Sequence, residues 1–62
     1  MTMQTIPTGQ VKTFGDFGIM YEVGNVIRCL DDGDMLMEVT LVESGEKVEY
    51  RLSCINSDPL AV

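Results

Sequence analysis

Residues 29–39 (CLDDGDMLMEV) place three aspartates around one glycine, a pattern that suits a cation-binding loop, a tight turn or an acidic contact surface. An EF-hand calcium loop needs oxygen ligands at its positions 1, 3, 5 and 12 and a glycine at position 6. With Gly33 at position 6, positions 1, 3 and 12 hold Arg28, Leu30 and Val39, which offer no carboxylate. The sequence therefore argues against a calcium site of this type, and we predict neither a metal nor a cofactor.

The residue types needed for catalysis are scarce in this chain of 62 residues. It has no histidine and two cysteines, too few for a structural zinc site, which needs four Cys or His ligands. No serine or cysteine has a visible base to activate it, and no glycine-rich loop is present to hold phosphate. Residues 16–18 spell the DFG triplet of protein kinases, but the catalytic loop of that family is missing. We therefore predict a protein that is not an enzyme.

The charge balance points to a basic partner. Four Lys+Arg against ten Asp+Glu give a net charge of −6, which argues against direct binding to nucleic acid or to an anionic membrane. Because many basic protein surfaces hold nucleic acid, we expect the partner to be a basic nucleic-acid-binding protein or complex. A net charge of this size also serves solubility alone, and the sequence leaves both readings open. With no secretory signal, no apolar run of about 20 residues and few cysteines, the expected compartment is the cytoplasm.

The spacing of apolar residues predicts a mostly β fold. We expect one small domain over residues 1–62, with a flexible N-terminal arm at residues 1–10 and a β-meander core at residues 21–54. The core is an antiparallel meander of three to four strands, either open or curled into an SH3-like barrel. Asp58 precedes Pro59 and suits the N-cap of a short C-terminal turn or helix, although a frayed end fits as well. So small a domain buries only about 60% of the surface its unfolded chain exposes, which leaves room for stabilisation by a partner.

The clearest hairpin joins residues 35–43 to residues 47–54. Both segments alternate at a period of two and are rich in β-branched, aromatic and other apolar residues, which is typical of strands. A two-residue Ser44-Gly45 loop gives every apolar residue on one face an apolar partner. The predicted pairs are Glu43 with Glu46, Leu41 with Val48, Val39 with Tyr50, Met37 with Leu52 and Met35 with Cys54, and on the other face Glu38 with Arg51.

A second hairpin joins residues 21–30 to the same central segment. A two-residue loop would place Arg28 opposite Met37 in the core, which is costly for an unpaired charge. A three-residue loop over residues 31–33 turns Arg28 outward and puts Gly33 at the left-handed position that closes such loops. The aspartate run is therefore predicted to serve mainly as a turn. The predicted pairs are Cys29 with Met35, Ile27 with Met37, Val23 with Leu41 and Tyr21 with Glu43.

The two cysteines are predicted to stay reduced. Cys29 and Cys54 flank Met35 on two different strands, so their Cα atoms lie twice the ~4.8 Å strand spacing apart. That separation exceeds the ~7 Å limit for a disulfide. Both are expected to be small buried hydrophobic residues.

The carboxylates gather at the two ends of the predicted sheet. The ends lie ~25 Å apart, and two glutamates sit between them on the outward face. Acidic groups in this arrangement can imitate the phosphates of duplex DNA, although carboxylates also collect at solvated turns without any partner. The candidate partner-binding residues are Asp31, Asp32, Asp34, Glu38, Glu43, Glu46 and Glu49.

Apolar residues on the outward face leave two other readings open. Val26, Leu36 and Val42 are predicted to face away from the core, so this face is either covered by the chain or docked against another molecule. Residues 47–54 form an edge strand that suits strand addition or a homodimer. The alternatives are an antitoxin-type or regulatory partner that binds one protein through the apolar face or the edge, and a self-assembling structural or accessory protein.

Four stretches of the chain resemble a known family. They are TFGDFGIMYEVG at residues 13–24, DDGD at residues 31–34, and LVESGEKVEYRLS at residues 41–53 followed by DP at residues 58–59. They are similar to a family of short, uncharacterised proteobacterial proteins that also occur in phage-derived regions. The resemblance implies a context, because small acidic phage-associated proteins are similar in kind to anti-CRISPR proteins, which block a nucleic-acid-handling complex by binding it. Together with the acidic ends, it leads us to expect an anti-CRISPR-like inhibitor that covers a basic surface of a CRISPR effector in the bacterial host cytoplasm. A self-assembling phage accessory protein is the alternative in the same context.

Overall fold

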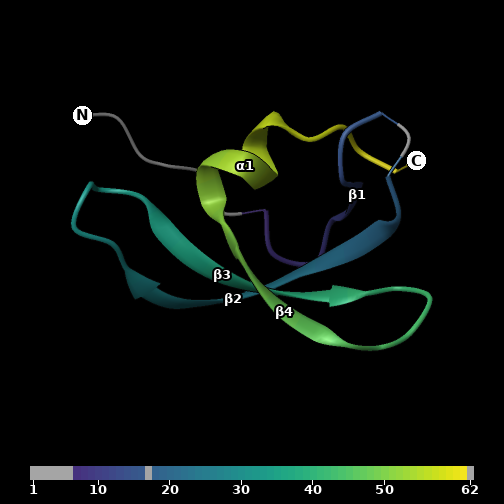
Figure 1. Ribbon diagram of the computed structural model, residues 1–62, viewed down its shortest axis with the longest axis horizontal. Helices are drawn as coiled ribbons and strands as arrows, with labels where there is room; N and C mark the ends of the chain where they lie inside the picture. Colours follow the sequence, from purple (N-terminus) through teal and green to yellow (C-terminus); the bar gives the residue numbers. More distant parts are fainter. Residues whose placement is uncertain (1–6, 17, 62) are drawn as a thin grey trace.

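Four strands form one antiparallel sheet, and a short helix lies against one of its faces (Figure 1). The computed structural model describes residues 7–16 and 18–61. The elements are β1 (Val11–Thr13), β2 (Met20–Cys29), β3 (Met35–Leu41), β4 (Lys47–Arg51) and α1 (Leu52–Ser57). The strands neighbour one another in chain order, which confirms the predicted β-meander, and the sheet stays open instead of closing into a barrel.

Residues 7–10 of the predicted arm are hydrogen-bonded to β2. Gly9 N donates to Val23 O at 2.8 Å, and Val23 N donates to Gln10 O at 2.9 Å. Residues 1–6, the rest of the predicted arm, lie outside the described residues.

The core fills the face of the sheet that carries α1. Its buried side chains are Tyr21, Val23, Met37, Val39, Leu52 and Ile55. Within each strand these residues are two apart, as expected for side chains that share a face, and in the helix they are three apart, which puts both on one side. Burial of an aliphatic side chain of this size contributes about 1.5–3 kcal/mol, so this cluster is what holds the helix on the sheet.

The β2–β3 turn has the three-residue loop that the sequence predicts. Leu30 N donates to Asp34 O at 2.8 Å, and Gly33 N donates to Leu30 O at 3.1 Å. Gly33 has a φ of +90°, in the left-handed region that favours glycine. Cys29 pairs with Met35 directly beside the turn, as predicted.

Farther from this turn, β2 leaves the predicted register because it contains two irregularities. The first lies between Val23 and Val26, and the second follows Val26. Each adds a residue to β2 relative to β3, so Val23 pairs with Val39 instead of with Leu41. Val26, predicted on the outward face, pairs with the buried Met37 and therefore lies on the core side of the sheet, where it is 39% exposed.

The β3–β4 hairpin forms where predicted, but its loop spans residues 42–45 rather than Ser44-Gly45 alone. Leu41 N donates to Glu46 O, and Gly45 N donates to Leu41 O, both at 2.8 Å. The predicted register is therefore wrong by two residues, and the observed pairs are Leu36 with Arg51, Met37 with Tyr50, Glu38 with Glu49, Val39 with Val48 and Thr40 with Lys47. A slip of two keeps every side chain on its own face, so apolar alternation could not distinguish the two registers.

The predicted strand over residues 47–54 is wrong beyond Arg51. β4 ends there and α1 begins at Leu52, so the predicted pairs of Leu52 and Cys54 with β3 do not form. The LSCI run places its two large aliphatic side chains three residues apart, which fits one face of a helix. In so short a run, this spacing competes with the period-two pattern that precedes it, and the pattern alone does not show where the strand stops.

The tail ends the helix rather than starting a new one, which corrects the prediction for Asp58. Asp58 N donates to Cys54 O and to Ile55 O, both at 3.1 Å, and Pro59 follows as a residue that cannot continue the helix. Within the described residues, no helix has the length and apolar character needed to cross a membrane.

The two edges of the sheet differ in how they are covered. Residues 59–61 lie along β1, where Thr13 N donates to Pro59 O at 3.1 Å and Ala61 N donates to Val11 O at 2.9 Å (Figure 1). In the part of the chain that the structure describes, no segment pairs in this way with the outer edge of β4. That edge is short and carries alternating charges, two features that discourage pairing with another chain.

Gly24→Ala should destabilise the protein. A Cβ atom at Gly24 would lie 2.8 Å from the carbonyl oxygen of Glu38 in the neighbouring strand. Because this oxygen belongs to the backbone and cannot swing away, we expect the free energy of unfolding in urea to fall by about 1–3 kcal/mol. Asn25→Ala, at the next and exposed position, is the control and should change it by no more than about 0.5 kcal/mol. Equal urea midpoints for the two variants would contradict the close approach of the strands.

Candidate functional site

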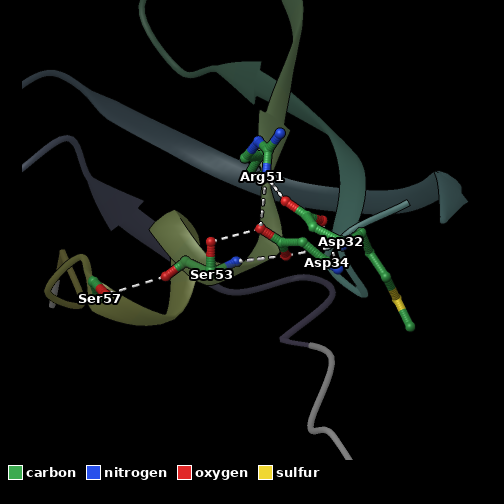
Figure 2. A network of polar contacts seen from close by, with 6 residues as sticks. Asp32, Asp34, Arg51, Ser53 and Ser57 are labelled. Atoms are coloured by element: carbon green, nitrogen blue, oxygen red, sulfur yellow. Dashed lines mark hydrogen bonds and ion pairs between the residues drawn. The ribbon is translucent and has the colours of Figure 1, made fainter. Parts of the chain in front are cut away.

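The aspartate run that stood out in the sequence lies against the start of α1 (Figure 2). The Asp34 carboxylate accepts the N–H of Met35 at 2.8 Å and the N–H of Ser53 at 3.1 Å, and it accepts the Ser53 hydroxyl at 2.6 Å. Ser53 is the second residue of the helix, whose N-cap residue, Arg51, makes no capping hydrogen bond through its own side chain. Asp34 therefore caps the helix from a distant part of the chain, and these hydrogen bonds, that of Ser53 first, hold its pKa below the usual range.

Asp32 stabilises the same junction. One of its carboxylate oxygens accepts the N–H of Asp34 at 3.0 Å, and the other accepts a hydrogen bond from the Arg51 guanidinium at 2.6 Å. The same guanidinium nitrogen lies 3.6 Å from Asp34. The hydrogen bond from Arg51 lowers the pKa of Asp32, and both carboxylates remain charged at neutral pH. Of the three aspartates predicted to contact a partner, Asp31 is exposed at the turn, whereas Asp32 and Asp34 make contacts within the chain.

The predicted glutamates fall into two groups. Glu38 and Glu49 face each other across β3 and β4, which corrects the predicted pairing of Glu38 with Arg51. The Lys47 ammonium lies 3.9 Å from Glu38, so the outward face carries charges of both signs. Glu43 lies in the β3–β4 loop and Glu46 directly follows it; both are exposed, and no ion pair among the described residues includes them.

Apolar side chains are exposed at the same end of the sheet as Glu43 and Glu46. In a meander, the β1–β2 turn and the β3–β4 loop lie at one end, and Val42 N donates to Met20 O at 3.0 Å to join them. Ile19, Met20 and Val42 are 47%, 41% and 48% exposed there. We call these apolar residues, together with the exposed acids around them, the turn end. Its members are Asp16, Ile19, Met20, Val42, Glu43 and Glu46.

Sequence reasoning found only part of the turn end. It singled out Val42 and the two glutamates and, as one alternative, expected Ile19 and Met20 to fold across the outward face, but it did not place Asp16, Ile19 and Met20 in one exposed surface with them. The signal was available in principle, since a meander brings alternate turns to one end of a sheet. It was missed because the predicted core began at residue 21, so the segment before it was not assigned to an end of the sheet.

Asp58 joins three parts of the chain that are distant in sequence. Its carboxylate accepts the hydroxyls of Tyr21 at 2.7 Å and Tyr50 at 3.1 Å, and the N–H of Gly15 at 3.2 Å. Both tyrosine rings pack against Phe14, with centroids 4.3 Å and 5.0 Å away. Burial of the two tyrosine hydroxyls raises their pKa most, and the hydrogen bonds to Asp58 raise it further. The pKa of Tyr50 is about 12, and that of Tyr21 is higher still.

An open hollow of about 320 Å³ lies between β4 and α1. It is lined by Tyr50, Ser53, Cys54, Ser57 and Asp58. Ser57 donates its hydroxyl hydrogen to Ser53 O at 3.1 Å, which places both serines on the same side of the helix (Figure 2). The hollow was not predicted, because Tyr50, Cys54 and Asp58 come together only when residues 52–57 form a helix.

The cysteines remain free thiols, as predicted. Cys54 is half-buried in the wall of the hollow, whereas Cys29 is exposed, so its predicted burial is wrong. The reason is that α1 contacts β3 and β4, and the part of β2 beyond its irregularities lies outside that cover. Among the described residues, no three His, Cys, Asp or Glu side chains are grouped to hold a metal ion.

Comparisons with known proteins identify relatives of the chain. Residues 1–62 match the model of a family described as Family of unknown function (DUF5397). A Haemophilus influenzae protein described as uncharacterized is 55% identical over 58 residues, which cover 94% of this chain and 92% of that protein. These matches agree with the predicted small, uncharacterised family, and neither description names an activity.

Asp34→Asn should lower stability at neutral pH more than Asp31→Asn does. The folded state holds the pKa of Asp34 below its unfolded value of about 3.9, so its contribution is complete above that value. The contribution is lost as the pH falls through the lowered pKa of the folded state, and the two variants should then converge. Urea midpoints measured from neutral pH down to about pH 2 test this. Coincident midpoints at neutral pH would mean that the charge of Asp34 does not contribute to the cap.

Stability should also fall at high pH, because the pKa of both tyrosines is higher in the folded state than in the unfolded state. The unfolded rings ionise near 10.0, whereas Tyr50 ionises at about 12 when folded. The stabilisation is therefore complete below about pH 10 and is lost as the pH rises toward about 12. Tyr50→Phe keeps the ring and should flatten this dependence in urea denaturation. Tyrosinate absorbance that rises fully near pH 10 in the folded protein would contradict the buried network.

Proposed function

For this chain, which belongs to the family of unknown function DUF5397, we propose the role of a small non-enzymatic binding protein that attaches to a basic protein surface. Its contact surface is the turn end. The observation that carries the proposal is the exposure of Ile19, Met20 and Val42 next to acidic side chains that form no ion pair among the described residues. The protein acts in this way in the bacterial cytoplasm.

The apolar part of the turn end supplies a driving force for association. Three apolar side chains that are each 41–48% exposed would lose contact with water in a complex, and apolar side chains exposed together at one end of a sheet suit an interaction site. Met20 adds an adaptable side chain, which suits a contact surface. The affinity would come mainly from this burial.

The acidic part of the turn end selects the partner. Asp16, Glu43 and Glu46 would repel the same residues of a second copy, so self-association through this surface is unfavourable. The ion pair of Lys47 is with Glu38, at 3.9 Å, and not with these acids. A surface that carries Lys or Arg around an apolar contact is the complementary partner, and surfaces of that composition commonly hold nucleic acid.

In its narrower form, the proposal is an inhibitor of anti-CRISPR type that competes with DNA for a basic channel of a CRISPR effector. Supporting this form, carboxylates are distributed over a body whose longest dimension is 35 Å, with Asp31 at one end and the turn end at the other. Glu38 and Glu49 lie between them on the outward face. Asp32 and Asp34 do not belong to this contact surface, because they cap and fix the helix.

The test compares two variants of equal net charge. Glu43→Gln with Glu46→Gln removes two charges from the turn end, and Asp31→Asn with Glu49→Gln removes two elsewhere. Tagged protein captures partners from a Haemophilus influenzae lysate at low salt, and a captured protein is then purified and titrated against each variant. We expect a basic nucleic-acid-binding protein that duplex DNA displaces, about tenfold weaker binding for the turn-end variant, and a clearly smaller loss for the other variant.

Two results would overturn the proposal. Equal weakening by both variants would mean that net charge, and not the turn end, determines binding. Capture that resists both salt and DNA would indicate apolar docking of an antitoxin-type or regulatory partner, since exposed charge attraction is screened by salt.

A further inference from the structure

The hollow between β4 and α1 has an unusual hydrogen-bonding composition. Each hydroxyl in its wall has one hydrogen, and each of those hydrogens is already donated within the chain. Ser53 donates to Asp34 at 2.6 Å, Ser57 donates to the backbone carbonyl of Ser53 at 3.1 Å, and Tyr50 donates to Asp58 at 3.1 Å. What remains available to a ligand is mainly oxygen lone pairs, so the hollow accepts hydrogen bonds and offers few.

The hollow also carries an uncompensated negative charge. Asp58 lines it, and the contacts of its carboxylate are two hydroxyls and one backbone N–H, all of them neutral donors. No ion pair among the described residues includes Asp58. Lys12, the buried cation of the core, directs its ammonium to Ile55 O at 2.7 Å instead. A positively charged ligand would therefore meet an acidic group with which no cation of the described residues forms an ion pair.

We propose that this hollow binds the guanidinium group of an arginine side chain from a protein partner. A guanidinium has five N–H donors and no acceptor, which matches a wall that offers lone pairs and a carboxylate. The aromatic ring of Tyr50 lines the same hollow and attracts cations through its π-electrons. A volume of about 320 Å³ is at the lower limit of ligand pockets and suits one side chain.

This site is separate from the turn end, with which it shares no residue. It can therefore be tested with single amino acids, whatever the outcome at the turn end. The probe is N-acetyl-arginine methylamide, with N-acetyl-citrulline methylamide as the neutral analogue of the same shape and N-acetyl-lysine methylamide as a cation without the planar group. Binding is followed by the backbone amide signals of the ¹⁵N-labelled full chain at moderate salt.

We expect the arginine probe to shift the amide signals of residues 50–58 with a dissociation constant on the order of 1 mM. Citrulline should bind at least about fivefold more weakly, because it lacks the charge that Asp58 attracts. The lysine probe should bind with an affinity between those of the arginine and citrulline probes. Equal affinities for arginine and citrulline would overturn the proposal, and so would shifts scattered over all the acidic residues.

Two arginine substitutions provide the matched structural control. Ser57→Arg places a cation at the wall of the hollow, on an exposed position in the last turn of the helix where a positive charge is tolerated. Ser44→Arg makes the same change in the exposed β3–β4 loop. We expect Ser57→Arg to abolish the shifts and Ser44→Arg to leave them unchanged, with both variants folded by their spectra. Unchanged binding by Ser57→Arg would place the site elsewhere and overturn the proposal.

Discussion

The chain changes from strand to helix between Arg51 and Leu52, and the carboxylate of Asp34 is what makes the change possible. The first N–H groups of a helix have no partner inside it, and here the residue at the start of the helix supplies none through its own side chain. Asp34 reaches across from the β2–β3 turn to the Ser53 N–H, and Asp32 fixes the Arg51 side chain beside it. The helix then brings Leu52 and Ile55 onto the sheet, so the core depends on a contact made by polar groups.

The sequence predicted those features that depend on neighbouring residues. Gly33 marked the three-residue turn because only a left-handed residue closes it, and the alternation in β3 and β4 showed which side chains share a face. The exact partners across the sheet could not be predicted, since a register two residues away satisfies the same alternation. The irregularities beside Gly24 left no signal in the apolar pattern, because an extra residue in a strand changes pairing without changing composition.

The helix and the candidate site were harder to predict for a different reason. The cap of α1 comes from a residue 19 positions earlier in the chain, so no local motif announces it. The same contact changes the interpretation of the acidic residues. Ten carboxylates look alike in the sequence, whereas the structure separates those that hold the fold together, such as Asp34 and Asp58, from those at the turn end that stay exposed. Net charge alone could not make that distinction.

The pairing of residues 59–61 with β1 has a consequence for the order in which the protein can form. β1 has only three residues, and one of its two edges is completed by a segment that the ribosome makes about 50 residues later. The β2–β3 and β3–β4 hairpins join neighbouring segments of the chain, so they can form without residues 59–61. The N-terminal edge of the sheet must wait for residues 59–61, and Asp58 joins Gly15, Tyr21 and Tyr50 at the same moment. A chain that lacks these residues would therefore leave the outer edge of β1 unpaired and open to strand addition by other chains.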